Sequence, residues 1–522
     1  MIKVDEVKLK IGFDQQDVIN ECAKKLNITK QDILSAELLK LSIDARKKPN
    51  IYYVANVGLN LTEKYEKLFI DKKYNLNREV LKFKQKQANV SPIVVGFGPA
   101  GMFCALMLAR MGLKPIVIEQ GKCVEQREQD VLAFWNERKL NKYSNVQFGE
   151  GGAGTFSDGK LNTNLNSAFS NMVINEFYYY GAPKSILYQS KPHIGSDNLK
   201  KVVKAIRQDI ISMGGQILFN TKLIDIGLNK NQVTHIIVKD TITGEQKKLV
   251  AHKLILALGH SARDTFKMLY GIGMDIKQKP FAMGVRIEQK QSDINESQYG
   301  RGYDKRLPSA DYKLVEHLKN GRSVFTFCMC PGGEVVASSS SEGEVVTNGM
   351  SYFARDKENA NSAVLVNVNV EDYDSTHPLS GLDFQAKYEK LAFELGGNNF
   401  NAPCQTVGSF LGTDVKTHII PSYKPNVTWA ELQKCLPNFV YDSLKQALPL
   451  FNKKIKNFAL NKNVLTAIES RSSCPLFLQR DAHFESSIKG IYPIGEGAGY
   501  AGGIVSSAID GIKVAEEIYT QF

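Results

Sequence analysis

The chain has 522 residues, of which 43% are hydrophobic and 23% are charged, and its formal net charge at pH 7 is +12. These proportions are typical of a soluble globular protein of about three domains. No apolar run approaches the length of a membrane span, and the first residues lack the apolar core of a signal peptide, so we expect a cytoplasmic protein. Its eight cysteines are scattered without metal-ligand spacing, which predicts reduced thiols and no metal site.

Residues 1–90 are predicted to form a small, separate α+β module. Two helices against a small sheet suggest a ferredoxin-like arrangement, with Asp14 as the N-cap of the first helix and the polar stretch 82–89 as a linker. Apolar alternation and helical spacing predict strands at 4–12, 33–43 and 51–59 and helices at 14–26 and 63–72.

This module holds half of the positive excess of the chain. A basic module can bind nucleic acid, but here the excess consists mostly of lysines interleaved with acidic residues, which is typical of a solvated surface. We therefore disfavour nucleic acid as a partner.

An apolar run at 93–95 leads directly into a glycine turn and then a helix-forming segment. The turn reads G-x-G-x-x-G: Gly96 permits the tight turn, Gly98 lets the backbone approach a pyrophosphate, and Gly101 lets the helix pack on the strand. A second apolar run ends in Glu119, whose carboxylate can accept both hydroxyls of a ribose and would repel a 2′-phosphate. The segment therefore indicates the adenosine half of NAD or FAD and disfavours NADP.

Two further glycine-rich segments favour FAD over NAD. Residues 148–160 combine five glycines with several hydroxyl side chains, so their backbone N–H groups can wrap a flat ring or a phosphate. Near the C-terminus a predicted strand runs into Gly495 and Glu496, and glycines then open a helix at 504–518. The N-terminus of that helix can stabilise the negative charge of a reduced flavin.

The order of these elements predicts an α/β fold with a discontinuous Rossmann-like FAD-binding domain. Its two parts are expected at 91–280 and 461–522, because the first and last glycine sites serve one extended cofactor. A mixed α+β substrate domain is expected between them at 281–460.

The fingerprint at 96–101, the loop at 150–160 and the tail at 495–504 resemble the bacterial FAD-dependent dehydrogenases of unassigned substrate, NAD(P)/FAD-dependent oxidoreductases of the glutathione-reductase-like flavoprotein superfamily. The likeness extends to 280–288 and 327–333 and covers most of the chain. It implies FAD bound in an extended form.

The resemblance also assigns positions to the cofactor. It implies that the diphosphate lies on the first glycine turn, the adenosine ribose at Glu119, the adenine at Leu223 and the flavin against the second and third glycine segments. The implied FAD-binding positions are Gly96, Gly98, Pro99, Ala100, Gly101, Glu119, Gln120, Lys122, Arg127, Gly151, Gly152, Gly154, Thr155, Ser157, Leu223, Ala257, Gly259, Gly495, Glu496, Ala501, Gly502, Gly503 and Ile504.

Four residues are candidates for the substrate pocket: Cys328, Cys330, Arg286 and Arg471. The cysteines lie one residue apart before a Pro-Gly-Gly sequence. A redox dithiol is one interpretation, but because a Cys-x-Cys ring is strained we favour a tight loop that lines the pocket. The arginines are equally consistent with an anionic substrate and with structural ion pairs.

We expect an FAD-dependent oxidoreductase that passes a hydride between bound FAD and an unidentified small organic substrate. We expect no separate nicotinamide-binding domain, so NAD(P)H enters only as a transient electron donor, if at all. The alternatives are a non-catalytic flavin-binding or RNA-associated protein and a NAD-only Rossmann dehydrogenase. The sequence does not indicate the oligomeric state.

Overall fold

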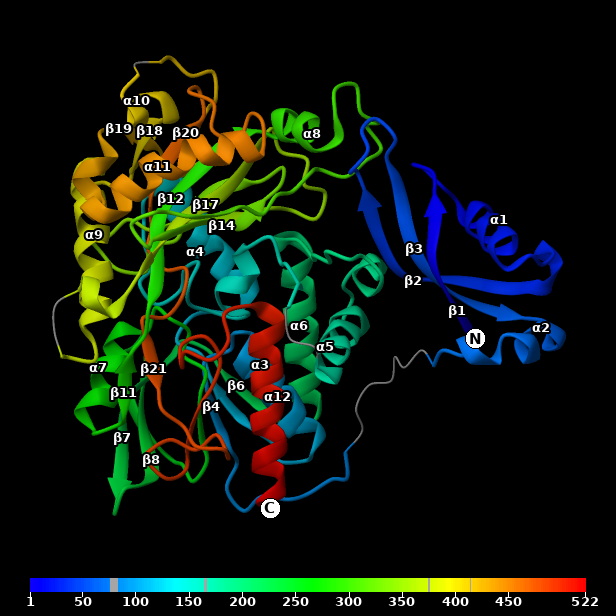
Figure 1. The fold of residues 1–522 in the computed structure, drawn as a ribbon. Helices are drawn as coiled ribbons and strands as arrows, with labels where there is room; N and C mark the ends of the chain where they lie inside the picture. Colours follow the sequence, from blue (N-terminus) through cyan, green and yellow to red (C-terminus); the bar gives the residue numbers. More distant parts are fainter. Residues whose placement is uncertain (76–82, 164–166, 374–375, 414) are drawn as a thin grey trace.

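Three bodies organise the chain in the computed structural model, which describes residues 1–75, 83–163, 167–373, 376–413 and 415–522. Figure 1 shows the N-terminal module to one side, a mixed sheet at the top, and a parallel sheet with its helices below. Among the described residues, no helix is both long and apolar enough to cross a membrane.

The N-terminal module has the first part of a ferredoxin-like topology. Its sheet order is β1-β3-β2, so β3 lies antiparallel between two strands that α1 connects. Asp14 caps α1 through a capping box with Asp17, as expected. In the described residues the edge beside β1 holds a single bridge from Ile2 to Lys73 in place of a fourth strand. The elements are β1 (Ile2–Leu9), α1 (Gln15–Leu26), β2 (Ile33–Asp44), β3 (Tyr52–Leu61) and α2 (Glu63–Leu68).

A five-stranded parallel sheet of order β22-β10-β4-β5-β6 forms the second body. Its strands are buried on both faces, which explains why the sequence reads as short continuous apolar runs. Strand residues alternate between two cores: Val94 packs with the helices on one face, while Ile93 and Val95 pack on the other. The strands are β4 (Ile93–Val95), β5 (Ile116–Ile118), β6 (Gln216–Leu218), β10 (Leu254–Leu256) and β22 (Ile491–Pro493).

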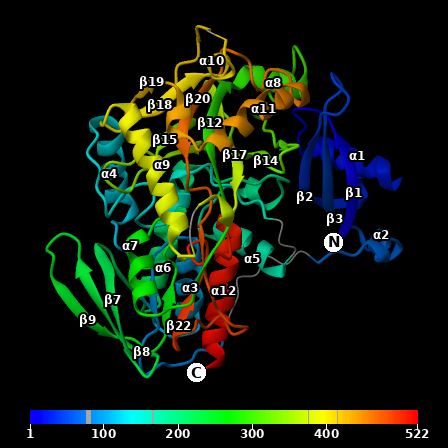
Figure 2. The same ribbon diagram turned by 60° about the vertical axis from the view of Figure 1, so that its left-hand side comes forward.

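Helices cover one face of this sheet and an antiparallel meander covers the other, as the turned view in Figure 2 shows. Strand β22 comes from the far end of the chain, so the discontinuous Rossmann-like fold is confirmed. The helices are α3 (Pro99–Arg110), α5 (Ala168–Tyr179), α6 (Ser196–Ser212) and α12 (Ile504–Thr520), and the meander strands are β7 (Thr221–Asn229), β8 (Gln232–Asp240) and β9 (Gln246–Val250).

The third body is a seven-stranded sheet of order β13-β14-β17-β12-β20-β18-β19. In β12, Met283, Val285 and Ile287 pack in the core with helix α11, so the alternate residue Arg286 faces the opposite side. The elements are β12 (Phe281–Lys290), β13 (Val315–His317), β14 (Ser323–Cys330), β17 (Asn359–Val368), β18 (Ala402–Thr406), β19 (Val427–Trp429), β20 (Val464–Glu469), α9 (Ser380–Gly396) and α11 (Asn438–Lys454).

The predicted end of the substrate domain at residue 460 is too early. Strand β20 begins at Val464 and pairs with β12 and β18, so it belongs to the seven-stranded sheet. A short apolar strand carries no sequence signal for the sheet it joins, which explains the error. The remaining elements are α4 (Val124–Glu137), α7 (Arg263–Gly271), α8 (Gln291–Tyr299), α10 (Val407–Leu411), β11 (Ile276–Gln278), β15 (Glu334–Ala337), β16 (Thr347–Met350) and β21 (Leu476–Leu478).

Candidate functional site

A cavity of about 490 Å³ lies where the parallel-sheet body meets the seven-stranded sheet. Its size is within the usual range for ligand sites. All three glycine-rich segments of the sequence reach it. The sequence-predicted residues that line it are Gly96, Gly98, Pro99, Ala100, Glu119, Gly152, Gly154, Ser157, Ala257, Gly259, Cys328, Arg471, Gly495, Glu496, Gly502, Gly503 and Ile504.

Two glycines of the first turn are required by the protein itself. Gly96 has φ +99°, and a Cβ on it would lie 2.3 Å from the carbonyl oxygen of Ala257. A Cβ on Gly101 would lie 2.0 Å from the carbonyl oxygen of Gly96. These positions therefore make the tight turn and seat α3 on the sheet, as the fingerprint predicts.

Other cavity glycines are not required by the protein. Gly98 has φ −79° and ψ −176°, which any residue can adopt, and a Cβ there would approach nothing closer than 3.6 Å. Gly502 likewise has no positive φ and has no atom within 4 Å of the Cβ position. Glycine at these two positions keeps space open for a group that the chain does not supply.

Two long helices begin at this cavity. Gly98 is the N-cap of α3 and Gly503 is the N-cap of α12, and both residues line the cavity. The first N–H groups of a helix have no intrahelical partners, and the helix dipole adds positive potential at that end. The cavity therefore offers two separate positions for negative charge.

Glu119 has a different immediate role from the one predicted. Its Oε2 accepts a hydrogen bond from the N–H of Phe97 at 2.9 Å, and its Oε1 accepts from the N–H groups of Gly121 at 2.9 Å and Gly149 at 3.0 Å. A carboxylate has about four acceptor positions. Glu119 thus ties the first and second glycine segments together, and about one acceptor position remains for a ligand that enters the cavity.

Gln120 and Leu223 lie in a smaller adjoining pocket of about 40 Å³. Gly96 and Glu119 line both this pocket and the main cavity, so the two spaces share part of a wall. This is the position that the resemblance assigns to an adenine ring.

Several predicted contact residues do not line either space. Arg127 is fully buried and donates to the carbonyl oxygens of Asn145, Val146 and Glu150 at 2.8, 2.9 and 2.6 Å, so it holds the second glycine segment from behind. Lys122 is bound to Asp130 at 2.8 Å, instead of flanking a nucleotide. The other predicted residues outside the lining are Gly101, Gly151, Thr155, Ala501, Arg286 and Cys330.

Arg286 is not available to a substrate. It is fully buried, and it donates to Glu469 at 3.0 Å, to Asn361 at 2.9 Å and to the carbonyl oxygen of Cys328 at 2.8 Å. Burial raises the pKa of Glu469 to about 7, although Arg286 opposes the shift. Of the two interpretations that the sequence left open for Arg286, the structure shows the ion pair, with Glu469, and Arg286 does not line the cavity.

Arg471 reaches the cavity wall but is held by carboxylates. Its guanidinium donates to Glu389 at 2.7 Å and to Glu344 at 3.0 Å, and Arg263 binds the same two carboxylates. Further bonds go to Ser340 at 2.6 Å and to Ser261 at 3.2 Å. This network fixes the guanidinium in place, so most of its donors serve the fold.

Cys328 and Cys330 lie at the end of strand β14, not in a tight loop. The register between β14 and β17 shifts between Phe327 and Cys330, which makes a β-bulge. Cys328 has φ +42° and lines the cavity, whereas Cys330 is fully buried behind it. The favoured loop interpretation is therefore wrong, because the bulge lets a strand residue reach the wall.

The lining residues that the sequence did not single out include Glu469, Lys313 and Asn348. Each comes from the seven-stranded sheet or its connections, where no glycine motif marks the site. His260 also lines the cavity, and burial lowers its pKa to about 3, so it is neutral near pH 7. Within the described ranges, no cluster of three or more His, Cys, Asp or Glu side chains could hold a metal ion.

Glu496 projects from the third glycine segment into the cavity wall. Burial raises the pKa of its carboxyl to about 8, with Lys279 opposing the shift. The group is therefore largely protonated near pH 7 and can donate as well as accept a hydrogen bond.

The raised pKa of Glu496 predicts a pH dependence of stability. The folded protein keeps a proton that the unfolded chain releases near the ordinary value of 4.5, so stability is lost as the pH rises from there to about 8. Glu496→Gln is expected to flatten this loss, measured as urea unfolding midpoints at about pH 6 and about pH 8.5. Glu342 is exposed, so Glu342→Gln is the control and should lose as much stability as wild type. An equal loss of stability in wild type, Glu496→Gln and Glu342→Gln would contradict the expectation.

Residual pH dependence is expected in the Glu496→Gln variant. Burial also raises the pKa values of Glu150 and Glu469 to about 7, and both act in the same direction.

A parallel sheet covered on both faces, with two helix N-termini and three glycine segments around one cavity, defines a Rossmann-like dinucleotide-binding protein. A family model described as FAD-dependent protein, C-terminal domain-like, matches residues 280–472, and a model of a domain of unknown function matches residues 1–60. A Clostridium beijerinckii protein described as uncharacterized is 46% identical over 537 residues, covering 100% of this chain and 99% of that protein.

Two solved structures are similar at lower identity. FrdA of the E. coli quinol fumarate reductase is 11% identical with a TM-score of 0.36, over 84% of this chain and 71% of that one. A flavoprotein/dehydrogenase from Cytophaga hutchinsonii is 11% identical with a TM-score of 0.36, over 84% and 78% of the chains. Because of its full-length relative and its matched domain, the chain belongs to the bacterial family of FAD-dependent proteins of unassigned substrate.

Proposed function

We propose that this protein is an FAD-dependent oxidoreductase that passes a hydride between bound FAD and a small organic substrate in the cavity. The observation that carries the proposal is the pair Gly98 and Gly502, glycines that the backbone and packing do not require, beside the beginnings of α3 and α12. Such glycines are explained by a close-fitting cofactor whose negative charges lie at the two helix ends.

Different residues of the chain would bind different parts of the cofactor. The N-terminus of α3 and the turn at Gly98 would hold the diphosphate, and Gln120 and Leu223 would enclose the adenine. The N-terminus of α12 would stabilise negative charge on the pyrimidine side of the ring. When bound, FAD supplies the hydride chemistry. Glu496, protonated near neutral pH, would donate a hydrogen bond to the ribityl chain or accept one from it.

The substrate would lie on the side of the cavity formed by the seven-stranded sheet. Lys313 and Asn348 line that side, and Lys160, from the second glycine segment, donates to Met329 of that sheet, so together they present positive charge and amide donors. They suit a substrate with a carboxylate or another small anionic group better than Arg286 does. A cytoplasmic setting and transient NAD(P)H reduction belong to the same proposal, the first because all eight cysteines are free thiols.

Purified protein tests the proposal directly. We expect a yellow protein that releases FAD on denaturation and whose flavin is bleached anaerobically by its true donor. Screening small organic acids, NADH and NADPH for bleaching would identify the donor. A colourless protein that takes up no added FAD, or one that takes up only NAD, would overturn the proposal.

A further inference from the structure

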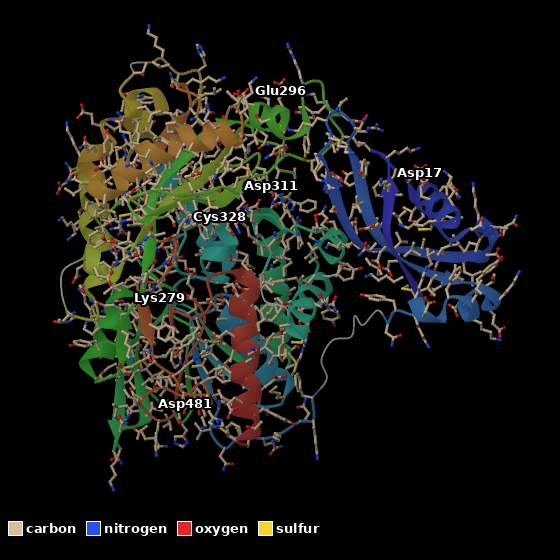
Figure 3. All side chains as sticks on the ribbon, viewed as in Figure 1. Asp17, Lys279, Glu296, Asp311, Cys328 and Asp481 are labelled. Atoms are coloured by element: carbon tan, nitrogen blue, oxygen red, sulfur yellow. The ribbon has the colours of Figure 1, made fainter. Side chains whose placement is uncertain are left out.

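The bulge at the end of β14 places two cysteines side by side at the cavity. Residues with a side chain rarely adopt a positive φ, and such conformations cluster at functional sites. Cys328 has φ +42° and faces the cavity. Figure 3 shows Cys328 close to the upper end of α12, where that helix begins, and Ile504 at that end lines the same cavity.

The two cysteines lie close together in a positively charged surrounding. The Cys330 thiol donates to the carbonyl oxygen of Cys328 at 3.3 Å. Arg286 Nη2 lies 3.8 Å from the Cys330 sulfur. The ammonium of Lys160 donates to the carbonyl oxygen of Met329, between the cysteines.

These contacts shift the pKa values of the two thiols in opposite directions. The neighbouring Cys330 side chain, with help from Lys160 and Arg286, lowers the pKa of the Cys328 thiol despite burial. The neighbouring Cys328 side chain and burial raise the pKa of Cys330 well above its ordinary value. Cys328 is thus the more acidic thiol of the pair, which is the arrangement of a reactive cysteine and a resolving cysteine.

The remaining cysteines do not share these features. Five of them are buried, and burial raises their thiol pKa values: Cys22, Cys104, Cys404, Cys435 and Cys474. The remaining one, Cys123, is partly exposed at the start of α4 and lines neither described pocket, so it provides a matched control.

We propose that Cys328 and Cys330 form a redox-active dithiol that exchanges two electrons with the flavin in the cavity, an inference that rests on the proposed function. In the oxidising direction both S–H bonds break, an S–S bond forms between the two sulfurs, and two electrons and two protons pass to oxidised FAD, giving FADH2. In the other direction reduced flavin returns them and opens the disulfide. A disulfide across one intervening residue is strained and easily reduced, so the second direction is favoured.

The number of electrons that the flavin-loaded protein takes up tests whether Cys328 and Cys330 are redox-active. After oxidation with diamide and removal of the reagent, wild type titrated anaerobically with dithionite should take up two electron equivalents more per flavin than Cys328→Ser/Cys330→Ser. Cys123→Ser should match wild type. If the double variant does not fold, as judged by its flavin spectrum, Cys330→Ala alone provides the same comparison.

Peptide mapping gives a readout that does not depend on turnover. Tryptic residues 323–355 contain both cysteines and no other. After oxidation this peptide should be lighter by two hydrogens and should resist alkylation. Equal electron uptake by wild type and double variant, with two alkyl labels on the peptide from oxidised protein, would overturn the inference while a bleachable flavin still supported the proposed function. Absence of flavin would overturn the proposed function instead, and the exchange proposal with it.

Discussion

Replacing Gly98 with valine is expected to lower the affinity for FAD at least ~100-fold, about 2.8 kcal/mol, while the fold remains intact. The backbone of Gly98 is extended, and a Cβ at this position would have as its nearest atom the Cα of Gly152, 3.6 Å away. The protein therefore has room for a Cβ at this position. A bound diphosphate leaves no such room, because it must approach the N-terminus of α3 through the same space.

Substitutions at two other glycines distinguish a loss of FAD binding from a loss of folding stability. Gly101→Ala places a Cβ 2.0 Å from the carbonyl oxygen of Gly96, so this variant is expected to lose stability first and flavin as a consequence. Gly271→Ala, at the end of α7, meets no atom within 4 Å and has no positive φ, so it should behave as wild type.

The measurement is flavin content after gel filtration, FAD affinity by fluorescence titration, and the urea unfolding midpoint of the flavin-free proteins. For Gly98→Val we expect a colourless protein with a wild-type midpoint. A flavin content equal to wild type would show that the cofactor does not approach this turn. A collapse of the midpoint would show that the space at Gly98 is used by the fold.

The parts of the site that depend on backbone conformation were predictable from the sequence. Gly96 and Gly101 are needed by a turn and a helix contact within a few residues, and local spacing is enough to recognise them. The three glycine segments also predicted that distant parts of the chain meet, and all three line one cavity in the structure.

The side chains that depend on neighbours from other elements were not predictable. Glu119 was expected to contact ribose, yet most of its acceptor positions are occupied by backbone N–H groups, one of them on Gly149, 30 residues away. Arg286 was a candidate for substrate binding because its ion-pair partner Glu469 follows it by 183 residues, and no local pattern in the sequence pairs the two. The cysteine bulge depends on the register between β14 and β17, which no local pattern encodes.

Arg127→Met is expected to lower the free energy of unfolding by about 4 kcal/mol and to release the flavin. The variant keeps the apolar stem but removes every donor, so three buried carbonyl oxygens lose their partner. It also removes the cation from above the ring of Phe156, 4.9 Å from the ring centroid. Because those carbonyls belong to 145–150, the segment that leads into the second glycine loop would no longer be fixed.

The same variant distinguishes the structural role from the cofactor contact that the resemblance implied. The midpoint of urea unfolding is compared with flavin removed from every protein, so that loss of bound FAD does not itself lower stability. Gln129→Ala, exposed on the same helix α4, should leave the midpoint and the flavin content unchanged. Arg127→Lys can satisfy only part of the carbonyl set and should fall between. If Arg127→Met lost FAD with an unchanged midpoint, the guanidinium would act on the cofactor directly. The three carbonyl bonds would then be incidental to the stability of the fold.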